Sequence, residues 1–238
     1  EKLEITADGK INVAKIKGNG IEIKGSDYSQ SEIASSDKDI NITANTVKLA
    51  GQTQANGNIN LNADVENDSE IFANGNLKTK DLTNSGKIQV SKTIQISGKL
   101  NNSGSVASVN KVTVTKDVKN TGEISTNDDF TAKNIVSSGK VSGKNIQVDN
   151  VSNNGKIIAA SNFKNSGKVL ANGNLSGKNA ENSGEVQAEN ISTDNVKNSG
   201  KINTKDFKSK NVTNTGKVLA SGKISADDVD NGGKILTN

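Results

Sequence analysis

The chain of 238 residues contains no cysteine, histidine, proline, methionine or tryptophan, and only 2% of its residues are aromatic. Without cysteine and histidine there is no disulfide framework, no thiol nucleophile, no imidazole base and no nitrogen- or sulfur-ligated metal site. All 30 cationic side chains are lysines, so the planar guanidinium that reads phosphates and base edges bidentately is also missing. We therefore expect no catalytic residues, no cofactor and no metal, and no binding of nucleic acid.

Long hydrophobic runs are absent as well. No stretch approaches the roughly 18 apolar residues of a membrane-spanning helix, and the chain begins at Glu1 without a basic and then apolar signal segment. We expect no transmembrane segment and a mature or excised piece of a longer protein. Because only 31% of the residues are hydrophobic and the net charge is a modest +4, the order of the apolar residues decides whether a core forms.

That order is a repeat. From residue 84 the chain reads NSGKIQVSKTIQISGKLN, NSGSVASVNKVTVTKDVK, NTGEISTNDDFTAKNIV and further units that open on Asn-x-Gly or a close variant. Two looser units precede them from Leu49. Stacking the units gives three apolar columns: Ile71, Ile88, Val106, Ile124, Val141, Ile157, Val169, Val186, Ile202, Val218 and Ile235; Leu77, Ile94, Val112, Phe130, Ile146, Phe163, Leu175, Ile191, Phe207 and Ile224; and Leu82, Leu100, Val118, Ile135, Val151, Val196, Val212 and Val229.

Alternation with a period of two around these columns indicates strands. Three short strands in one unit cannot bury their apolar sides alone, but stacked copies close an interior. The sequence therefore predicts an all-β fold, a three-faced parallel β-helix with about 16 to 18 residues per rung, enough for three short strands and their corners. The absence of proline agrees with this, since every internal strand must donate its N–H groups.

The Asn-x-Gly corner follows from the same alternation, which points its asparagine inward. Because a buried amide is costly unless it is hydrogen-bonded, we expect stacked corners to form an amide ladder with a structural role. Asn-Gly pairs at Asn56, Asn74, Asn154, Asn172 and Asn231 indicate turns. The predicted ladder comprises Asn84, Asn102, Asn120, Asn165, Asn182, Asn198 and Asn214.

The repeat divides the chain into two parts of one continuous solenoid. Residues 1–48 keep the alternation but lose the Asn-x-Gly phase, which predicts irregular rungs with longer loops around residues 25–31, where Tyr28 lies. Residues 49–238 form the regular repeat. One unit, NNGKIIAASNFK from Asn153, is too short for three faces, so we expect a defect near residues 153–168, where either Phe163 serves two columns or the solenoid kinks.

The repeated NSGK, an apolar residue and a small residue, together with ANGNL at residues 73–77 and 171–175, resembles the haemagglutinin repeats of filamentous-haemagglutinin-type exoproteins over about residues 49–238. This chain is richer in lysine and asparagine and has shorter units. The resemblance implies a right-handed parallel β-helix in a secreted adhesin or a stick protein of contact-dependent growth inhibition. It also implies export through an outer-membrane two-partner transporter to the bacterial cell surface.

Three surface features are candidates for chemistry. The acidic pairs Asp128-Asp129 and Asp227-Asp228 are too far apart along the solenoid to form one polysaccharide-cleaving site, and with three phenylalanines in the core only Phe72 and Tyr28 remain as surface aromatics. A lysine follows the corner glycine in many units and points outward, which predicts a line of ammonium groups or simply a solubilising face. The candidate binding face comprises Lys140, Lys156, Lys168, Lys201, Lys217 and Lys234.

Three functions remain. The leading expectation is a structural or adhesive filament segment of a large secreted exoprotein, acting as an extended stalk. The alternative is that the fragment itself binds a host or bacterial surface glycan or receptor through the lysine-lined face. The third, a polysaccharide-degrading β-helix enzyme, lacks a clustered set of carboxylates with an activated base, and we do not expect the chain to be an enzyme.

Overall fold

The computed structural model describes residues 1–153 and 155–237, and the side chains of residues 156, 160, 170, 172 and 173 also lie outside the described set. The predicted turn residue Asn154 and the side chain of Lys156 fall outside the described residues. The backbone of Asn172 lies within the strand Lys168–Asn182, so the turn predicted there is wrong. The chain forms two compact units, Glu1–Asn127 and Asp128–Asn238. In both units the described residues form strands and turns without a helix.

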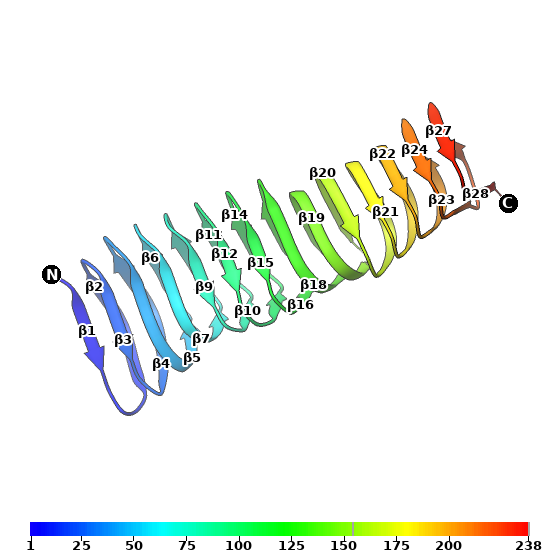
Figure 1. The fold of residues 1–238 in the computed structure, drawn as a ribbon. Coiled ribbons are helices and arrows are strands. Elements are labelled where there is room, and N and C mark those ends of the chain that lie inside the picture. The colour runs from blue at the N-terminus through cyan, green and yellow to red at the C-terminus, as the bar shows by residue number, and fades with distance from the viewer. Residues whose placement is uncertain (154, 238) are drawn as a thin grey trace. The chain divides into compact units, whose positions relative to one another are not determined.

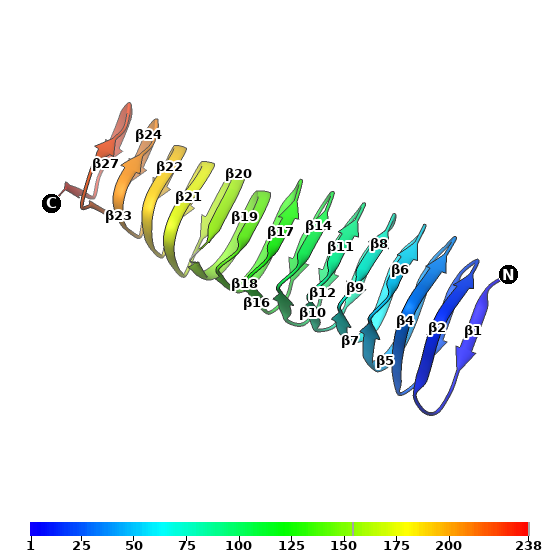
Figure 2. The same cartoon turned by 180° about the vertical axis from the view of Figure 1, so that it is seen from behind.

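Unit 1 is a stack of short strands that follow one another around successive coils (Figures 1 and 2). Its strands are β1 (Leu3–Thr6), β2 (Ile11–Gly18), β3 (Ile21–Lys24), β4 (Asp27–Ser36), β5 (Ile40–Leu49), β6 (Gln52–Ala55), β7 (Ile59–Asn67), β8 (Glu70–Ala73), β9 (Leu77–Thr79), β10 (Leu82–Asn84), β11 (Lys87–Val90), β12 (Ile94–Ile96), β13 (Leu100–Asn102), β14 (Ser105–Ser108), β15 (Val112–Val114), β16 (Asp117–Asn120) and β17 (Glu123–Thr126).

Unit 2 has fewer and longer strands, several of which bend around a corner of the coil (Figure 1). They are β18 (Asp129–Ser137), β19 (Lys140–Asn153), β20 (Lys156–Asn165), β21 (Lys168–Asn182), β22 (Glu185–Asn198), β23 (Lys201–Lys208), β24 (Asn211–Asn214), β25 (Lys217–Ala220), β26 (Ile224–Ser225), β27 (Asp228–Asn231) and β28 (Lys234–Thr237).

The strand pairings described in unit 1 are parallel and join neighbouring coils. Ile88 lies between Ile71 and Val106, and Leu100 lies between Leu82 and Val118. These side chains are buried. Stacking like on like in this way fills the interior with β-branched and leucine side chains at strand spacing. The predicted β-solenoid is confirmed, and in unit 1 the three apolar columns have the predicted order.

Residues 1–48 follow the same winding. Ile21 pairs with Ile40 and Ile40 with Ile59, so one inner column runs from these coils into the regular repeat. Tyr28 lies in β4 between Ile11 and Val47 and is 2% exposed. The expectation of a surface Tyr28 in a longer loop is therefore wrong.

The alternation of β4 puts Tyr28 and Gln30 on its inner side, and the polar Gln30 hides the pattern in the sequence. Inside the coil, the Gln30 Nε2 donates to the Gln52 carbonyl at 2.8 Å, and the Thr53 hydroxyl donates to the Gln30 Oε1 at 3.2 Å. Burial raises the pKa of the Tyr28 hydroxyl well above its ordinary value. A polar inner layer thus replaces apolar contacts in this part of the N-terminal coils.

In unit 2 the apolar columns no longer stack in the order that the sequence repeat predicts. Ile157 pairs with Leu175, and Val151 pairs with Val169. The first column of the sequence repeat therefore does not continue from Ile157 to Val169, as the stacking of units predicts. From Asn165 onward each column lies one face earlier around the coil than the stacking of units predicts.

The short unit from Asn153 is accommodated by this shift and not by a short coil. Phe163 belongs to a single column, between Ile146 and Ala180. The proposal that Phe163 serves two columns is wrong. The register slips by one residue around Ala159, where the neighbouring strands are irregular. The coils here keep a length of 16 to 18 residues because each strand must meet its neighbour's hydrogen-bonding groups, whereas the repeat motif is free to move to another corner.

Glycine is required at the Asn-x-Gly corner by the closeness of the next coil. A Cβ on Gly104 would overlap the carbonyl oxygen of Gly86, and one on Gly200 would overlap that of Gly184. Each of these glycines has an ordinary negative φ or extended backbone. Their role is thus close approach of stacked backbones, not a left-handed turn.

Candidate functional site

The corner asparagines form a buried amide ladder in each unit. In unit 1 the Nδ2 of Asn84 donates to the Oδ1 of Asn102, and Asn102 donates in the same way to Asn120, both at 2.8 Å. Each amide also donates to backbone carbonyls at its own and the next corner: for Asn102 these are Gly104 and Glu123, both at 3.1 Å. The ladder therefore satisfies polar backbone that the turn removes from the sheet.

The predicted ladder residues fall into two separate runs. The first begins at Asn67, which stacks on Leu49, and passes through Asn84, Asn102 and Asn120. The second begins at Asn165, which stacks on Val148, and passes through Asn182, Asn198, Asn214 and Asn231. At both starting residues the buried Oδ1 has no hydrogen-bond donor. The ladder is a structural device, with each start leaving one acceptor unused.

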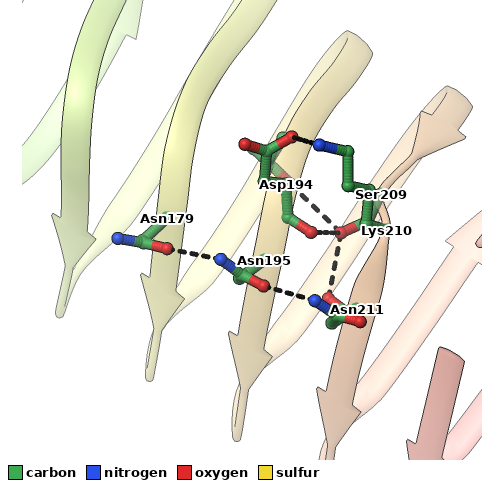
Figure 3. Close-up of polar contacts among 7 residues, drawn as sticks. Asn179, Asp194, Asn195, Ser209, Lys210 and Asn211 are labelled. Carbon is green, nitrogen blue, oxygen red and sulfur yellow. Dashed lines mark hydrogen bonds and ion pairs between the residues drawn. The ribbon is translucent and has the colours of Figure 1, made fainter.

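Unit 2 carries a second, outward amide ladder that the sequence analysis did not find. The Nδ2 of Asn195 donates to the Oδ1 of Asn179, and that of Asn211 donates to Asn195, both at 2.7 Å (Figure 3). The run continues through Asn162 to Asn145, which donates to the Asp129 carboxylate. Here each amide donates toward the preceding coil, opposite to the inner ladder. The signal in the sequence is an asparagine directly before the second-column residues Ile146 and Phe163 and, in the later units, before the third-column position, which the shift of the repeat places on the same face.

The predicted lysine line is divided by the shift of the repeat. Lys140 pairs with Lys156, but Lys168 belongs to a different row, in which it pairs with Glu185. That row is Lys168, Glu185, Lys201, Lys217 and Lys234. The structure thus brings together only three consecutive lysines from the predicted face: Lys201, Lys217 and Lys234.

The electrostatics of this row are partly balanced. The Lys201 ammonium lies 3.0 Å from a Glu185 carboxylate oxygen, and this hydrogen bond lowers the pKa of Glu185. Lys217 and Lys234 are exposed on the outer side of β25 and β28. An outward cationic row of this kind attracts anions at long range and is screened by salt.

Each of the other predicted surface features is described within its own unit. Phe72 is half-buried, and the Lys87 ammonium lies 5.2 Å from the centre of its ring, a cation–π contact. The Asp129 carboxylate accepts from Asn145, and Asp227 and Asp228 are exposed. Across the described part of the chain, no three acidic side chains gather in a way that would hold a metal ion.

Two grooves lie beside lysine pairs that the sequence analysis missed. The segments NLKTKDLTN (residues 76–84) and DFKSKNVTN (residues 206–214) are alike, and each places a lysine on both sides of a buried hydroxyl. In unit 1, Lys78 and Lys80 line a groove of about 490 Å³. In unit 2, Lys208 and Lys210 line one of about 660 Å³.

The two grooves differ in charge. The unit 2 groove also contains Lys178, Asp194 and Asp227, and the Lys210 ammonium lies 3.0 Å from the Asp194 carboxylate (Figure 3). The unit 1 groove is lined on its outer side only by lysines and uncharged polar side chains: Asn60, Asn62, Lys78, Lys80, Gln95 and Ser97. The same lysine pair is therefore partly neutralised in one unit and uncompensated within the lining of the other.

Comparison with known proteins gives no match to a protein-family model, to a curated protein or to a solved structure. Within the described residues, no helix is long and apolar enough to cross a membrane. We therefore infer the function from the fold and the surface chemistry of the chain.

Proposed function

We propose that the chain is a non-catalytic, extended segment of a large secreted bacterial exoprotein, in which it acts as a stalk. The observation that carries this proposal is the stacking of parallel coils in each unit, with one apolar residue of each face resting on its counterpart in the next coil. In such a fold each coil contacts only its neighbours, so length grows with the number of coils at a fixed rise.

The repeats support a more specific assignment to the surface of a Gram-negative cell. Their resemblance to haemagglutinin repeats implies an adhesin or a stick protein of contact-dependent growth inhibition, exported through an outer-membrane two-partner transporter. A parallel solenoid suits this route because neighbouring coils are close in sequence, and folding can propagate from the part already outside the membrane.

The proposal is tested on intact cells of the organism that encodes the chain. Antibodies raised against residues 1–238 are expected to label unbroken cells and to lose their target when the cells are treated with external protease. Electron microscopy of the purified chain is expected to show elongated particles. Labelling only after lysis, or round particles, would contradict the proposed role.

A second candidate function is adhesion to an anionic surface glycan or receptor through the lysine row, favoured by the register of Lys201, Lys217 and Lys234. Binding to a glycan array should weaken with salt and weaken further in a variant with Lys168, Lys201 and Lys217 changed to Glu. The matched control is Lys140→Glu, because Lys140 lies in another row. Binding that ignores both salt and the triple change would remove this candidate.

A further inference from the structure

The groove of unit 1 lies at a corner of the solenoid that is shorter than the corners it pairs with. Leu77 pairs with Ile59 and Ile94, and Leu82 pairs with Val65 and Leu100. The segment from Leu77 to Leu82 is one residue shorter than the segments that it pairs with, Ile59 to Val65 and Ile94 to Leu100. The groove residues come from this shorter corner and from the corners of the two neighbouring coils.

The side chains around this recess form a definite chemical environment. Lys78 and Lys80 are two residues apart, so they leave the chain on the same side, and the Thr79 between them is 5% exposed and turns inward. Asn60 and Asn62 lie on one side of them, and amide and hydroxyl groups of the following coil lie on the other. The lining offers two positive charges together with donors and acceptors suited to hydroxyl groups.

Within the described part of unit 1, the two ammonium groups are not committed to a carboxylate. The ion pairs described in this unit involve Lys2, Lys24 and Lys48. The carboxylate nearest in sequence is that of Asp81, which accepts from the backbone N–H of Lys99 at 2.8 Å and does not line the groove. An anion that binds in the groove therefore does not have to displace a carboxylate from either lysine.

We propose that the unit 1 groove binds a short acidic oligosaccharide, whose carboxylate or sulfate lies between Lys78 and Lys80 and whose hydroxyl groups meet the amides on either side. Its volume is in the range of small-molecule sites. No aromatic side chain lines it to stack a base. Strand β9 is paired on both sides, which leaves no edge for an extended peptide.

This inference goes beyond the stalk function and does not depend on it, because a stalk needs no ligand. It also names a different place from the lysine row of unit 2. The unit 2 groove supplies an internal comparison, since its similar segment carries Lys208 and Lys210 beside Asp194 and Asp227. We expect the carboxylates there to repel the same ligand.

The test uses the full chain and three hexasaccharides of one backbone: one carrying carboxylates, its carboxyl-reduced neutral form, and an O-sulfated neutral form. Isothermal titration at low and at physiological ionic strength measures affinity. We expect at least one acidic form to bind and the neutral form not to bind. The two acidic arms identify which anionic group the lysines select.

The Lys78→Gln/Lys80→Gln variant should lose about tenfold or more in affinity, because two charge-assisted contacts are removed. The matched Lys208→Gln/Lys210→Gln variant should stay within about twofold of the parent chain. Circular dichroism checks that both variants keep the fold, as expected for outward side chains. Failure of both acidic forms to bind, or equal losses in the two variants, would overturn the proposal.

Discussion

Units 1 and 2 are built from the same sequence repeat but relate it to the coil in different ways. In unit 1 each corner asparagine from Asn67 to Asn120 stacks on its own counterpart in the repeat. In unit 2, Asn153 pairs with Ala171 and Asn165 pairs with Val148. The difference teaches that the fold preserves the inward alternation and holds the coil within a narrow range of lengths, whereas the motif placed at each corner is exchangeable.

Because the Asn-x-Gly motif changes corners, the inner amide ladder starts twice, and each start has an energetic cost. Because each amide donates toward the following coil, the first asparagine of a run has an Oδ1 with no donor, as at Asn67 and Asn165. A buried acceptor without a partner costs about 1–3 kcal/mol. Once begun, each further rung of the ladder is fully bonded, so this cost arises once per run.

The largest loss of stability is expected at the corner glycines, where in both units the backbones of stacked coils approach closely. Gly104→Ala in unit 1 and Gly200→Ala in unit 2 should each lower the free energy of unfolding by more than about 3 kcal/mol, because the new methyl group overlaps a backbone carbonyl that cannot move alone. Gly9→Ala and Gly232→Ala are matched controls, since nothing lies within 4 Å of a Cβ there. Chemical denaturation measures all four. Equal effects at corner and control glycines would show that stacking at the corner is not tight.

The next prediction compares positions within each ladder. Asn102→Ala and Asn198→Ala, in the middle of the two runs, should cost about 2–3 kcal/mol, because each removes the acceptor of the preceding amide, the donor to the following amide and the donor to backbone carbonyls. Asn67→Ala and Asn165→Ala, at the starts, should cost only about 1–2 kcal/mol. Equilibrium unfolding in denaturant gives the order. A start that proves as costly as a middle would contradict the account of the unused Oδ1.

A third prediction moves the start of the second ladder. Val148→Asn places a donor beside the unbonded Oδ1 of Asn165 and moves the unused acceptor to residue 148, so the net cost is the lost apolar burial alone, about 1–2 kcal/mol. The same change at Val106, between Ile88 and Ile124, meets only apolar neighbours and should cost about 3 kcal/mol or more. The difference between the two free energies of unfolding is the measurement. Equal costs would show that the new amide at residue 148 does not bond to the Oδ1 of Asn165.

The fold was predictable because alternation and turn residues agree over many units. The order Ile71, Ile88, Val106 and Ile124 follows from stacking Asn-x-Gly motifs and holds in unit 1. It fails after Ile157, because aligning motifs assumes that a motif always occupies the same corner. Counting one full coil of residues onward from Ile157 instead leads to Leu175, which is the observed register.

The candidate sites were less predictable, since they depend on register. The lysine line was drawn through Lys156 and Lys168, which the shifted repeat places in different rows. The unit 1 groove lies where one residue is missing between Leu77 and Leu82, and the trace of that missing residue in the sequence is a unit one residue shorter than the units on either side. A hollow of this kind is visible only after neighbouring corners are compared.

The smallest effect concerns outward carboxylates that pair with lysines in the two units. Hydrogen bonds from Lys2 and then Lys24 lower the pKa of Glu22 from its ordinary 4.5 to about 2, whereas Glu185 has its pKa lowered mainly by the single Lys201. A carboxyl whose folded pKa is depressed adds stability above its unfolded pKa, and this stability is lost as the pH falls from 4.5 toward 2. Both groups are in contact with solvent, so the contribution is small and screened by salt.

Glu22→Gln should therefore lower the melting temperature slightly at neutral pH, and by more than Glu185→Gln, because two ion pairs are lost in place of one, although Lys2 keeps its pair with Glu4. Both differences should vanish below pH 2 and shrink at high ionic strength. Glu32→Gln is the control, since Glu32 is exposed and belongs to none of the described ion pairs. A lower melting temperature that persists in acid would have to arise from packing of the changed side chain. At that pH the Glu carboxyl of the parent chain is protonated, so neither chain carries a charge at this position.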